Sequence, residues 1–181
     1  MIFKELPLRG AYEIELERKE DGRGFFARMS CQDEFLTLGI TINWQQVNCS
    51  FTKSKGTVRG LHYQRQPFSD AKLVRCIRGA AWDVIVDLRE GSLTYGEWTR
   101  VILDEEKRSM VYIPPGFAHG FQSLQANTEL LYFHSNAYAP DFEGGLPYND
   151  PTLKIGWKLP VHGLSARDSN FLPFNSWDHG L

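Results

Sequence analysis

Residues 72–92 read KLVRCIRGAAWDVIVDLREGS and hold two apolar-rich runs, which are split by Arg78-Gly79. Both runs have the length and the branched or aromatic side chains that favour a β-strand, and Glu90-Gly91-Ser92 supplies a turn after the second. Residues 97–140 continue this pattern with further short strands, separated by turn segments at 104–107, 114–116 and 125–127. Regular short strands with turns between them predict an all-β sandwich or barrel rather than alternating strands and helices.

The N-terminal part adds strands and one short helix. Residues 12–16 alternate apolar and polar side chains and end before the turn Asp21-Gly22, which indicates a half-buried strand. Residues 31–38 predict a helix with Phe35 and Leu38 on one face and Gly39 as its stop. Residues 43–50 return to strand character and place Gln46, Asn48 and Ser50 on one side.

The C-terminal part is predicted to be irregular. After residue 140 a glycine pair and several prolines leave a loop-rich tail that wraps the β body. No internal repeat or low-complexity linker divides the chain. We therefore expect a single domain over residues 1–181, with a core at about 10–140 and a wrapping segment at about 141–181.

Composition excludes several classes of function. The chain has 181 residues, of which 42% are hydrophobic, and a net charge of −2, so it lacks the basic footprint of a nucleic-acid-binding protein. No apolar stretch approaches the length of a membrane span or of a signal-peptide core, and we expect a cytoplasmic protein. Cys31, Cys49 and Cys76 form no C-x-x-C pair, which favours three small buried side chains over disulfides or a thiolate zinc site.

One histidine lies in an unusual charged setting. His62 follows Arg59, and Lys72 comes ten residues later, while Gly56 and Gly60 allow the backbone to turn and then to approach another group closely. A proton carrier beside two cations suits an anionic substrate on which negative charge develops at an oxygen. A buried structural histidine with surface cations explains this segment equally well.

A second segment raises the question of a metal. Residues 114–119, PPGFAH, have the spacing of the second half of the cupin motif, which ends in His119. A metal-binding cupin also needs an H-x-H pair and a glutamate, but His62 is followed only by Tyr63 and Gln64. Two imidazoles without a third ligand cannot complete a zinc or iron site. The sequence thus predicts a jelly roll that binds no metal.

Five segments together resemble one known family. GTVRGLHYQ, KLVRCIRGAAWDVIVDLREGSLTYGEW, YIPPGFAHGF, ELLYFHSNAYAP and YNDPTLKIGW occur in the order and at the spacings of the dTDP-4-dehydrorhamnose 3,5-epimerase family, and the similarity covers about residues 10–172. It implies a cupin jelly roll, a homodimer and no metal or organic cofactor. It also implies inversion of carbons beside the ketone of a nucleotide-linked 4-keto-6-deoxy sugar, commonly on the route to dTDP-L-rhamnose.

The resemblance also implies roles for individual residues. His62 matches the base that removes a proton beside the ketone, Asp168 the carboxylate that orients it, Lys72 the cation that stabilises the enolate and Tyr132 the acid on the opposite face. Further matches predict substrate contacts: Arg59 and His119 near the diphosphate, Gln46 and Asn48 in the nucleotide groove, Tyr138 near nucleotide and sugar, and Arg23 and Phe26 from the neighbouring subunit. Without the resemblance, the Phe pair at 25–26 and Tyr132 are more typical of packing in the core.

The chain departs from the family at positions near the expected substrate. Arg28, Cys49, Phe133, Ala137 and Pro147 replace residues that the family usually has there. Our hypothesis is a pathway-specific relative that inverts only C3 or only C5, or that takes another deoxysugar. Two further classes remain: a 3,4-ketoisomerase of a nucleotide-linked keto sugar, which normally carries two neighbouring histidines, and a non-catalytic carbohydrate-binding cupin, in which a catalytic position should be lost.

Overall fold

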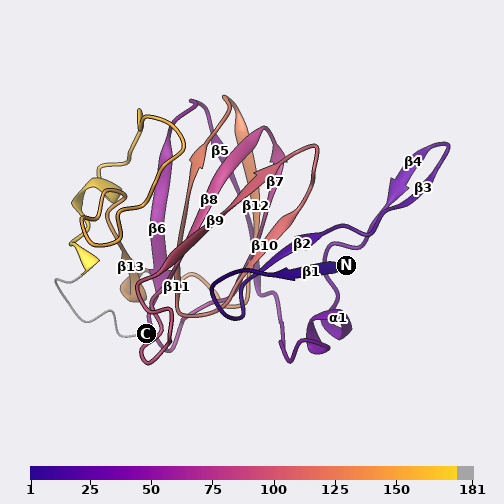
Figure 1. Ribbon diagram of the computed structural model, residues 1–181, viewed down its shortest axis with the longest axis horizontal. Coiled ribbons are helices and arrows are strands. Elements are labelled where there is room, and N and C mark those ends of the chain that lie inside the picture. Colours follow the sequence, from indigo (N-terminus) through magenta and orange to yellow (C-terminus); the bar gives the residue numbers. More distant parts are fainter. Residues whose placement is uncertain (175–181) are drawn as a thin grey trace.

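The computed structural model describes residues 1–174, and its main body consists of two antiparallel sheets that face each other (Figure 1). The larger sheet has the strand order β1 (Ile2–Glu5), β2 (Tyr12–Glu15), β10 (Met110–Ile113), β7 (Lys72–Arg78), β12 (Thr128–His134) and β5 (Gln46–Thr52). The smaller sheet has the order β13 (Glu143–Gly145), β6 (Val58–Gln64), β11 (Phe117–Ser123), β8 (Ala80–Asp87) and β9 (Trp98–Asp104). This all-β, cupin-like jelly roll confirms the predicted fold class.

The two apolar runs of residues 72–92 form β7 and β8, as predicted, but the two strands lie in different sheets. Gly79 joins them with a φ of 74°, and a Cβ there would lie 2.9 Å from Thr128 Oγ1. A glycine is therefore needed where the chain crosses from one sheet to the other. The later turn segments also lie where predicted, between β9, β10, β11 and β12.

The hydrophobic core fills the space between the sheets. Val74 and Leu130 point inward from the larger sheet and meet Ile85 and Phe121 of the smaller one, all essentially excluded from solvent. Alternate residues of β8 face the other way, where the C-terminal segment covers them with Leu153 and other apolar side chains. Both faces of the central strands β8 and β11 are thus buried, which holds these strands, and the side chains they carry, in fixed positions.

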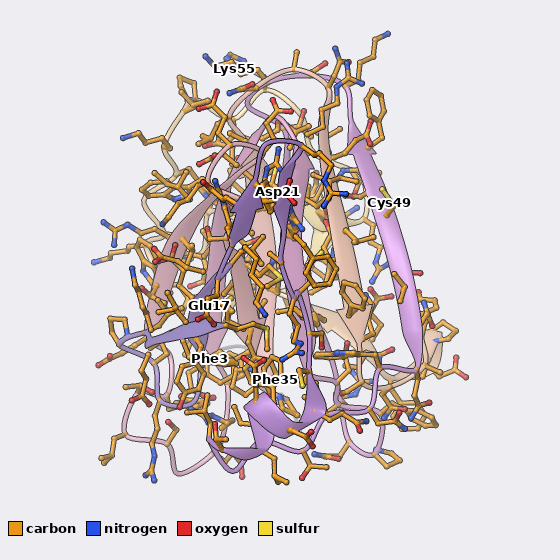
Figure 2. The ribbon with its side chains drawn as sticks, turned by 90° about the vertical axis from the view of Figure 1, so that its right-hand side faces the viewer. Phe3, Glu17, Asp21, Phe35, Cys49 and Lys55 are labelled. Atoms are coloured by element: carbon orange, nitrogen blue, oxygen red, sulfur yellow. The ribbon has the colours of Figure 1, made fainter. Side chains whose placement is uncertain are left out.

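The N-terminal region contains a hairpin and the helix. Strands β3 (Lys19–Asp21) and β4 (Gly24–Phe26) form a two-stranded hairpin that projects away from the body (Figure 1), with Asp21 near its tip (Figure 2). Helix α1 (Gln32–Leu36) is shorter than predicted and buries Phe35. The prediction that Leu38 shares this face is wrong, because the helix ends first and Leu38 remains 37% exposed. Gly39, with a φ of 73°, follows as the predicted stop.

Cysteine burial differs from the expectation. Cys76 is buried in the core and Cys31 is partly covered, but Cys49 is exposed. Cys49 lies on β5, which is the edge strand of its sheet and begins three residues later than predicted (Figure 2). An edge strand with an uncovered outer face leaves its outward side chains in solvent, so the prediction of three buried cysteines is wrong for Cys49.

Two short 3₁₀ helices complete the described chain, η1 (Pro140–Phe142) and η2 (Asp168–Asn170). The latter brings Asp168 against β6. Within residues 1–174, no helix is long and apolar enough to cross a membrane.

Candidate active site

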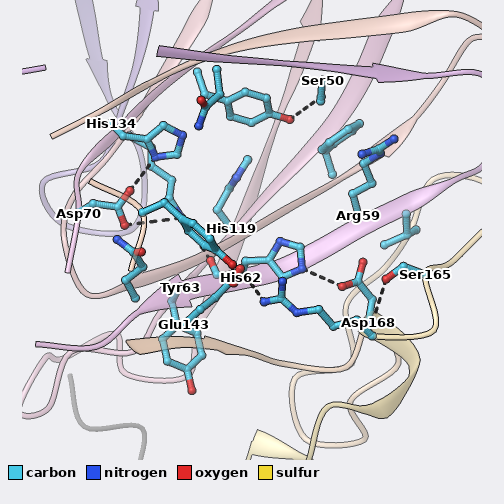
Figure 3. Close-up of a pocket in the computed structure, with 18 of the residues that line it drawn as sticks. Ser50, Arg59, His62, Tyr63, Asp70, His119, His134, Glu143, Ser165 and Asp168 are labelled. Atoms are coloured by element: carbon cyan, nitrogen blue, oxygen red, sulfur yellow. Dashed lines mark hydrogen bonds and ion pairs between the residues drawn. The ribbon is translucent and has the colours of Figure 1, made fainter. Parts of the chain in front are cut away.

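A pocket with a volume of about 690 Å³ is lined by inward-facing residues of both sheets and by residues 163–168 of the C-terminal segment (Figure 3). Nine of the eleven site residues expected from the sequence line it: Gln46, Asn48, Arg59, His62, Lys72, His119, Tyr132, Tyr138 and Asp168. They come from strands far apart in sequence, so the jelly-roll topology creates the site.

Strand β6 brings His62 into the pocket beside β11. His62 pairs in register with His119, and the register of β6 and β11 shifts between His119 and Phe121. Gly60 has a φ of 114°, and a Cβ there would lie 2.6 Å from the Cα of Gly120. The close approach expected after Gly60 is confirmed, and only glycine permits it.

Asp168 holds the imidazole of His62. Its Oδ1 lies 2.8 Å from His62 Nε2, and its Oδ2 accepts a hydrogen bond from the backbone N–H of Gly60 at 3.3 Å. Burial by itself would raise the pKa of Asp168, but the hydrogen bond and charge of His62 outweigh burial, so the pKa is lowered. An ionised carboxylate only accepts, so Nε2 carries the hydrogen, and Nδ1 keeps the lone pair that a base needs.

A lysine from the opposite sheet reaches the same strand. Lys72 is 8% exposed, and its Nζ donates to the backbone carbonyl of His62 at 3.4 Å. A cation is therefore fixed beside the histidine with little water around it, where its field is strong.

Tyr132 supplies a phenol from β12. Its hydroxyl lies 2.9 Å from Ser50 Oγ, and burial raises its pKa well above the usual range. The phenol is therefore protonated at neutral pH and can donate a proton. Tyr132 belongs to the larger sheet and His62 to the smaller one, so the two groups stand on different walls of the pocket.

His119, like His62, is paired with an aspartate, but this pair is more deeply buried. Its Nε2 lies 2.8 Å from Asp83 Oδ2, and both side chains are buried. Burial raises the pKa of Asp83, although His119 opposes this shift. Arg59, by contrast, lies near the rim and donates to the carbonyl of Phe51 at 2.9 Å, which leaves guanidinium donors for a ligand.

Polar side chains frame another part of the lining. Gln46 donates to Asn48 at 3.1 Å and accepts from the backbone N–H of Tyr138 at 3.1 Å. The Tyr138 hydroxyl donates to Glu143 at 2.6 Å, and Arg167 forms an ion pair with the same carboxylate at 2.6 Å. These contacts join β5, the segment before η1 and the C-terminal segment around the pocket.

Arg23 and Phe26 do not line the pocket. Both lie on the projecting hairpin, where the Arg23 side chain is 91% exposed and pairs with Asp21 at 2.7 Å, and where Phe26 is 75% exposed. Within a single chain, they therefore contribute nothing to the lining.

Of the five departures from the family, only Cys49 belongs to the residues around the pocket, and it alternates along β5 with the inward-facing Asn48 and Ser50, so its exposed side chain lies on the outer face. Arg28 pairs with Glu34 at 2.6 Å near helix α1, so its charge is balanced within the chain. Phe133 packs against Trp44 in a cluster on the other face of the larger sheet. Within a single chain, most of these substitutions therefore lie outside the pocket lining.

Sequence reasoning missed several lining or supporting residues: Asp70, Asp83, His134, Glu143, Ser165 and Arg167. Strand alternation gives a signal for His134, which stands two residues after Tyr132 and so shares its face. The others support a neighbour across the fold, and one sequence offers no signal for such a contact. Among residues 1–174, no three histidine, cysteine or acidic side chains are grouped so that they could hold a metal ion.

The fold and the site together define a class of protein. A cupin-like jelly roll that holds a carboxylate-oriented histidine, a buried ammonium group and a protonated phenol around one pocket is an enzyme equipped for proton transfer at carbon. A family model described as dTDP-4-dehydrorhamnose 3,5-epimerase matches residues 5–176, and the chain belongs to this family.

Individual relatives agree with this assignment. A dTDP-4-dehydrorhamnose 3,5-epimerase of Sinorhizobium fredii is 39% identical over 171 residues, which cover 94% of this chain and 88% of the relative. The crystal structure of a protein of the same name from Elizabethkingia anophelis is similar with a TM-score of 0.95 and 38% identity, covering 98% of both chains. The structure of ChmJ, a 3'-monoepimerase from Streptomyces bikiniensis, is similar with a TM-score of 0.85 and 35% identity, covering 93% of this chain and 85% of that one.

Proposed function

We propose that this enzyme inverts C3, C5 or both in a dTDP-linked 4-keto-6-deoxy sugar through an enolate, with no metal or organic cofactor, in deoxysugar biosynthesis. The observation that supports it most is the arrangement of His62, Lys72 and Tyr132, since inversion needs a base, a cation and an acid around one carbon. A C–H bond beside a ketone is only weakly acidic, so all three groups are required to act on it at neutral pH.

The reaction follows from these positions. Nδ1 of His62 removes the proton from the carbon beside the ketone, and Asp168 stabilises the imidazolium that forms. The electron pair moves onto the ketone oxygen, where the Lys72 ammonium stabilises the enolate. Tyr132 then delivers its proton to the same carbon from the other wall, and exchange with water returns both groups to their starting states.

Substrate contacts are assigned to the remaining residues. Arg59 and His119 bind the diphosphate, since a guanidinium and an imidazole donate to phosphate oxygens. Gln46, Asn48 and Tyr138 contact the nucleotide and the sugar. A doubly charged diphosphate does not cross a membrane unaided, and we accordingly expect a cytoplasmic enzyme.

A homodimer completes the site in this proposal. The projecting hairpin leaves Phe26 and Arg23 without contacts to the pocket of their own chain, although a ring and a guanidinium suit a nucleotide base and a phosphate. Arg23 and Phe26 of the partner subunit would then reach each pocket. The Phe26→Ala variant should therefore raise KM for the nucleotide sugar more than it changes kcat.

Proton exchange followed by NMR tests the proposal. The protein, treated with a chelator, is incubated in heavy water with dTDP-4-keto-6-deoxyglucose, alongside a His62→Ala variant. We expect deuterium at C3, C5 or both, and none above background in the variant. Deuterium at C3 alone would assign a 3'-monoepimerase activity like that of ChmJ, which the 35% identity makes the second candidate.

Other outcomes favour the remaining classes. Movement of the ketone from C4 to C3 would indicate a ketoisomerase. Binding of the nucleotide sugar without exchange at either carbon would indicate a non-catalytic cupin, and the proposed function would then be wrong.

A further inference from the structure

A buried lysine needs an anionic partner, and for Lys72 the nearest is Asp70. Lys72 and Asp70 are 8% and 6% exposed, and Lys72 Nζ lies 3.9 Å from Asp70 Oδ1. An unpaired ammonium at such a position tends to lose its proton, because burial disfavours the charged form. Asp70 thus provides a compensating charge next to the cation of the proposed epimerisation site.

A third residue fixes this carboxylate. His134 stands in register with Lys72 on the neighbouring strand β12, and its Nδ1 lies 2.8 Å from Asp70 Oδ2 (Figure 3). The Ser135 hydroxyl also accepts the backbone N–H of Ala71 at 2.7 Å, which ties the segment between Asp70 and Lys72 to the same strand. Each oxygen of Asp70 therefore faces a different neighbour, and the carboxylate has little freedom to turn away.

The charge state of Asp70 agrees with this geometry. Burial by itself would raise the pKa of Asp70, but the charge of Lys72 and the hydrogen bond with His134 outweigh burial and lower the pKa. The carboxylate is therefore ionised at neutral pH. Since it can only accept, His134 donates through Nδ1.

We propose that Asp70 is a positioning residue that keeps the Lys72 ammonium charged and aimed into the pocket, and that His134 holds Asp70 in place. This inference rests on the proposed function, because it assigns Lys72 to the enolate. Asp70 has no hydrogen bond or ion pair with the base or the phenol, so its influence on the reaction would pass through Lys72. His134 also stacks on the ring of Tyr132, with the ring centroids 6.1 Å apart, so only its hydrogen bond to Asp70 acts on Lys72.

Other charged or titratable groups also surround Lys72. They are His62 on β6, His119 on β11, and Tyr132 and His134 on β12, all of which line the pocket, and Asp83 on β8, which does not line it but pairs with His119. Asp83 is close enough that the charge of Lys72 affects its pKa, but it is engaged by His119. Removal of the Asp70 charge therefore leaves Lys72 without its nearest ionised partner.

The test is the Asp70→Asn variant, which keeps the size of the side chain and removes its charge. Lys72 is observed by NMR in protein labelled at the lysine ε-carbon, with the signal assigned from a Lys72→Met variant. We expect the titration midpoint of Lys72 to fall by about one pH unit or more, because a charge roughly 4 Å away is lost. The high-pH limb of kcat should shift in parallel. At neutral pH kcat should fall with a smaller change in KM, because Lys72 is no longer held in its position toward the enolate.

Two further variants separate positioning from a structural role. Asp33→Asn removes a carboxylate from helix α1, away from the pocket lining, and should leave the Lys72 titration unchanged. His134→Asn retains an N–H donor for Asp70, whereas His134→Leu does not, so the loss of kcat should be smaller for the asparagine variant.

The outcomes are distinguishable. An unchanged Lys72 midpoint in Asp70→Asn would overturn the inference, even if kcat and thermal stability both fell, because that pattern marks a structural residue. If the wild-type enzyme turns over no nucleotide keto sugar, the proposed function fails, and the Lys72 titration still decides whether Asp70 sets its charge.

Discussion

Two histidine–aspartate pairs in the pocket have the same hydrogen-bond length and opposite electrostatic settings. His62 and His119 face each other across β6 and β11, and each imidazole Nε2 lies 2.8 Å from a carboxylate oxygen. The His62 side chain is 33% exposed, however, and that of His119 is 7% exposed. The pKa of Asp168 is lowered and that of Asp83 is raised.

The difference comes from what surrounds each carboxylate. Asp168 receives a second hydrogen bond from Gly60, and Ser165 Oγ accepts its backbone N–H at 3.0 Å. Asp83 is fully enclosed, and its Oδ1 has no hydrogen-bond partner among the described residues. A histidine that acts as a base carries a positive charge during the reaction. The pair of His62 and Asp168, with its ionised carboxylate and its access to water, is therefore suited to proton transfer. The enclosed pair of His119 and Asp83 is suited to holding a ligand.

Loss of the imidazoles tests this division most strongly. His62→Asn should lower kcat by about 10³-fold, since general base catalysis contributes roughly 10²–10⁴-fold. His119→Ala should act mainly by raising KM, because one donor to the diphosphate is lost. Steady-state kinetics with the nucleotide sugar measures both. Equal losses of kcat in the two variants would contradict the division of roles.

The two carboxylates provide the next comparison. Asp168→Asn should lower kcat by about 10²-fold or more, because the amide favours the wrong tautomer of His62 and cannot stabilise the imidazolium. Asp83→Asn should lower kcat less than tenfold, since Asp83 is hydrogen-bonded to His119 and not to the base His62. The kcat of each variant, measured beside circular dichroism spectra that confirm folding, decides this. A greater loss of kcat in Asp83→Asn than in Asp168→Asn would show that His119, and not His62, is the base.

Gly60 links the two pairs, and its replacement should affect both. In Gly60→Ala the new Cβ would lie 2.7 Å from the His119 carbonyl oxygen, at a φ that L-residues rarely adopt. We expect a loss of about 2 kcal/mol or more in the free energy of unfolding, measured by urea denaturation. Gly22→Ala, on the exposed hairpin where a Cβ meets nothing within 4 Å, is the matched control and should change stability by less than about 1 kcal/mol.

The sequence was sufficient to predict one pair and insufficient for the other. His62 stands out because of its charged neighbours, and Asp168 was matched to it only through the family motif. Asp83 lies in an apolar strand, where its role depends on β8 and β11 being neighbours in the sheet. Alternation along a strand predicts which residues share a face, but it does not predict which strands become adjacent.

The same limit explains the other differences. The strands of residues 72–92 were predicted correctly, while their division between two sheets depends on packing that no local pattern encodes. Leu38 and Cys49 were misplaced because burial at a helix end and at a sheet edge is decided by what covers them. Gly60 was predicted well, since a glycine inside a strand has a local physical reason.

The smallest expected effect concerns the pH dependence of stability, where the two carboxylates should act with opposite signs. The lowered pKa of Asp168 means that the unfolded chain retains a proton the folded protein has released, so stability rises with pH up to about pH 4 and is lost as pH falls. The raised pKa of Asp83 means that the folded protein retains the proton, so stability falls as pH rises above about 4.

Variants isolate each contribution. Relative to wild type, Asp168→Asn should become less stable as pH rises toward about 4, and Asp83→Asn should become more stable as pH rises above that value. Each slope is at most about 1.4 kcal/mol per pH unit. Urea denaturation between pH 3 and pH 8 measures the free energy of unfolding of each variant and of wild type. Subtracting the wild-type value at each pH removes the contributions of the other titrating groups. If the two stability differences changed with pH in the same direction, burial would not shift the pKa values of Asp168 and Asp83 in opposite directions. The proposal that His62 is the base and His119 binds the ligand would then lose its electrostatic support.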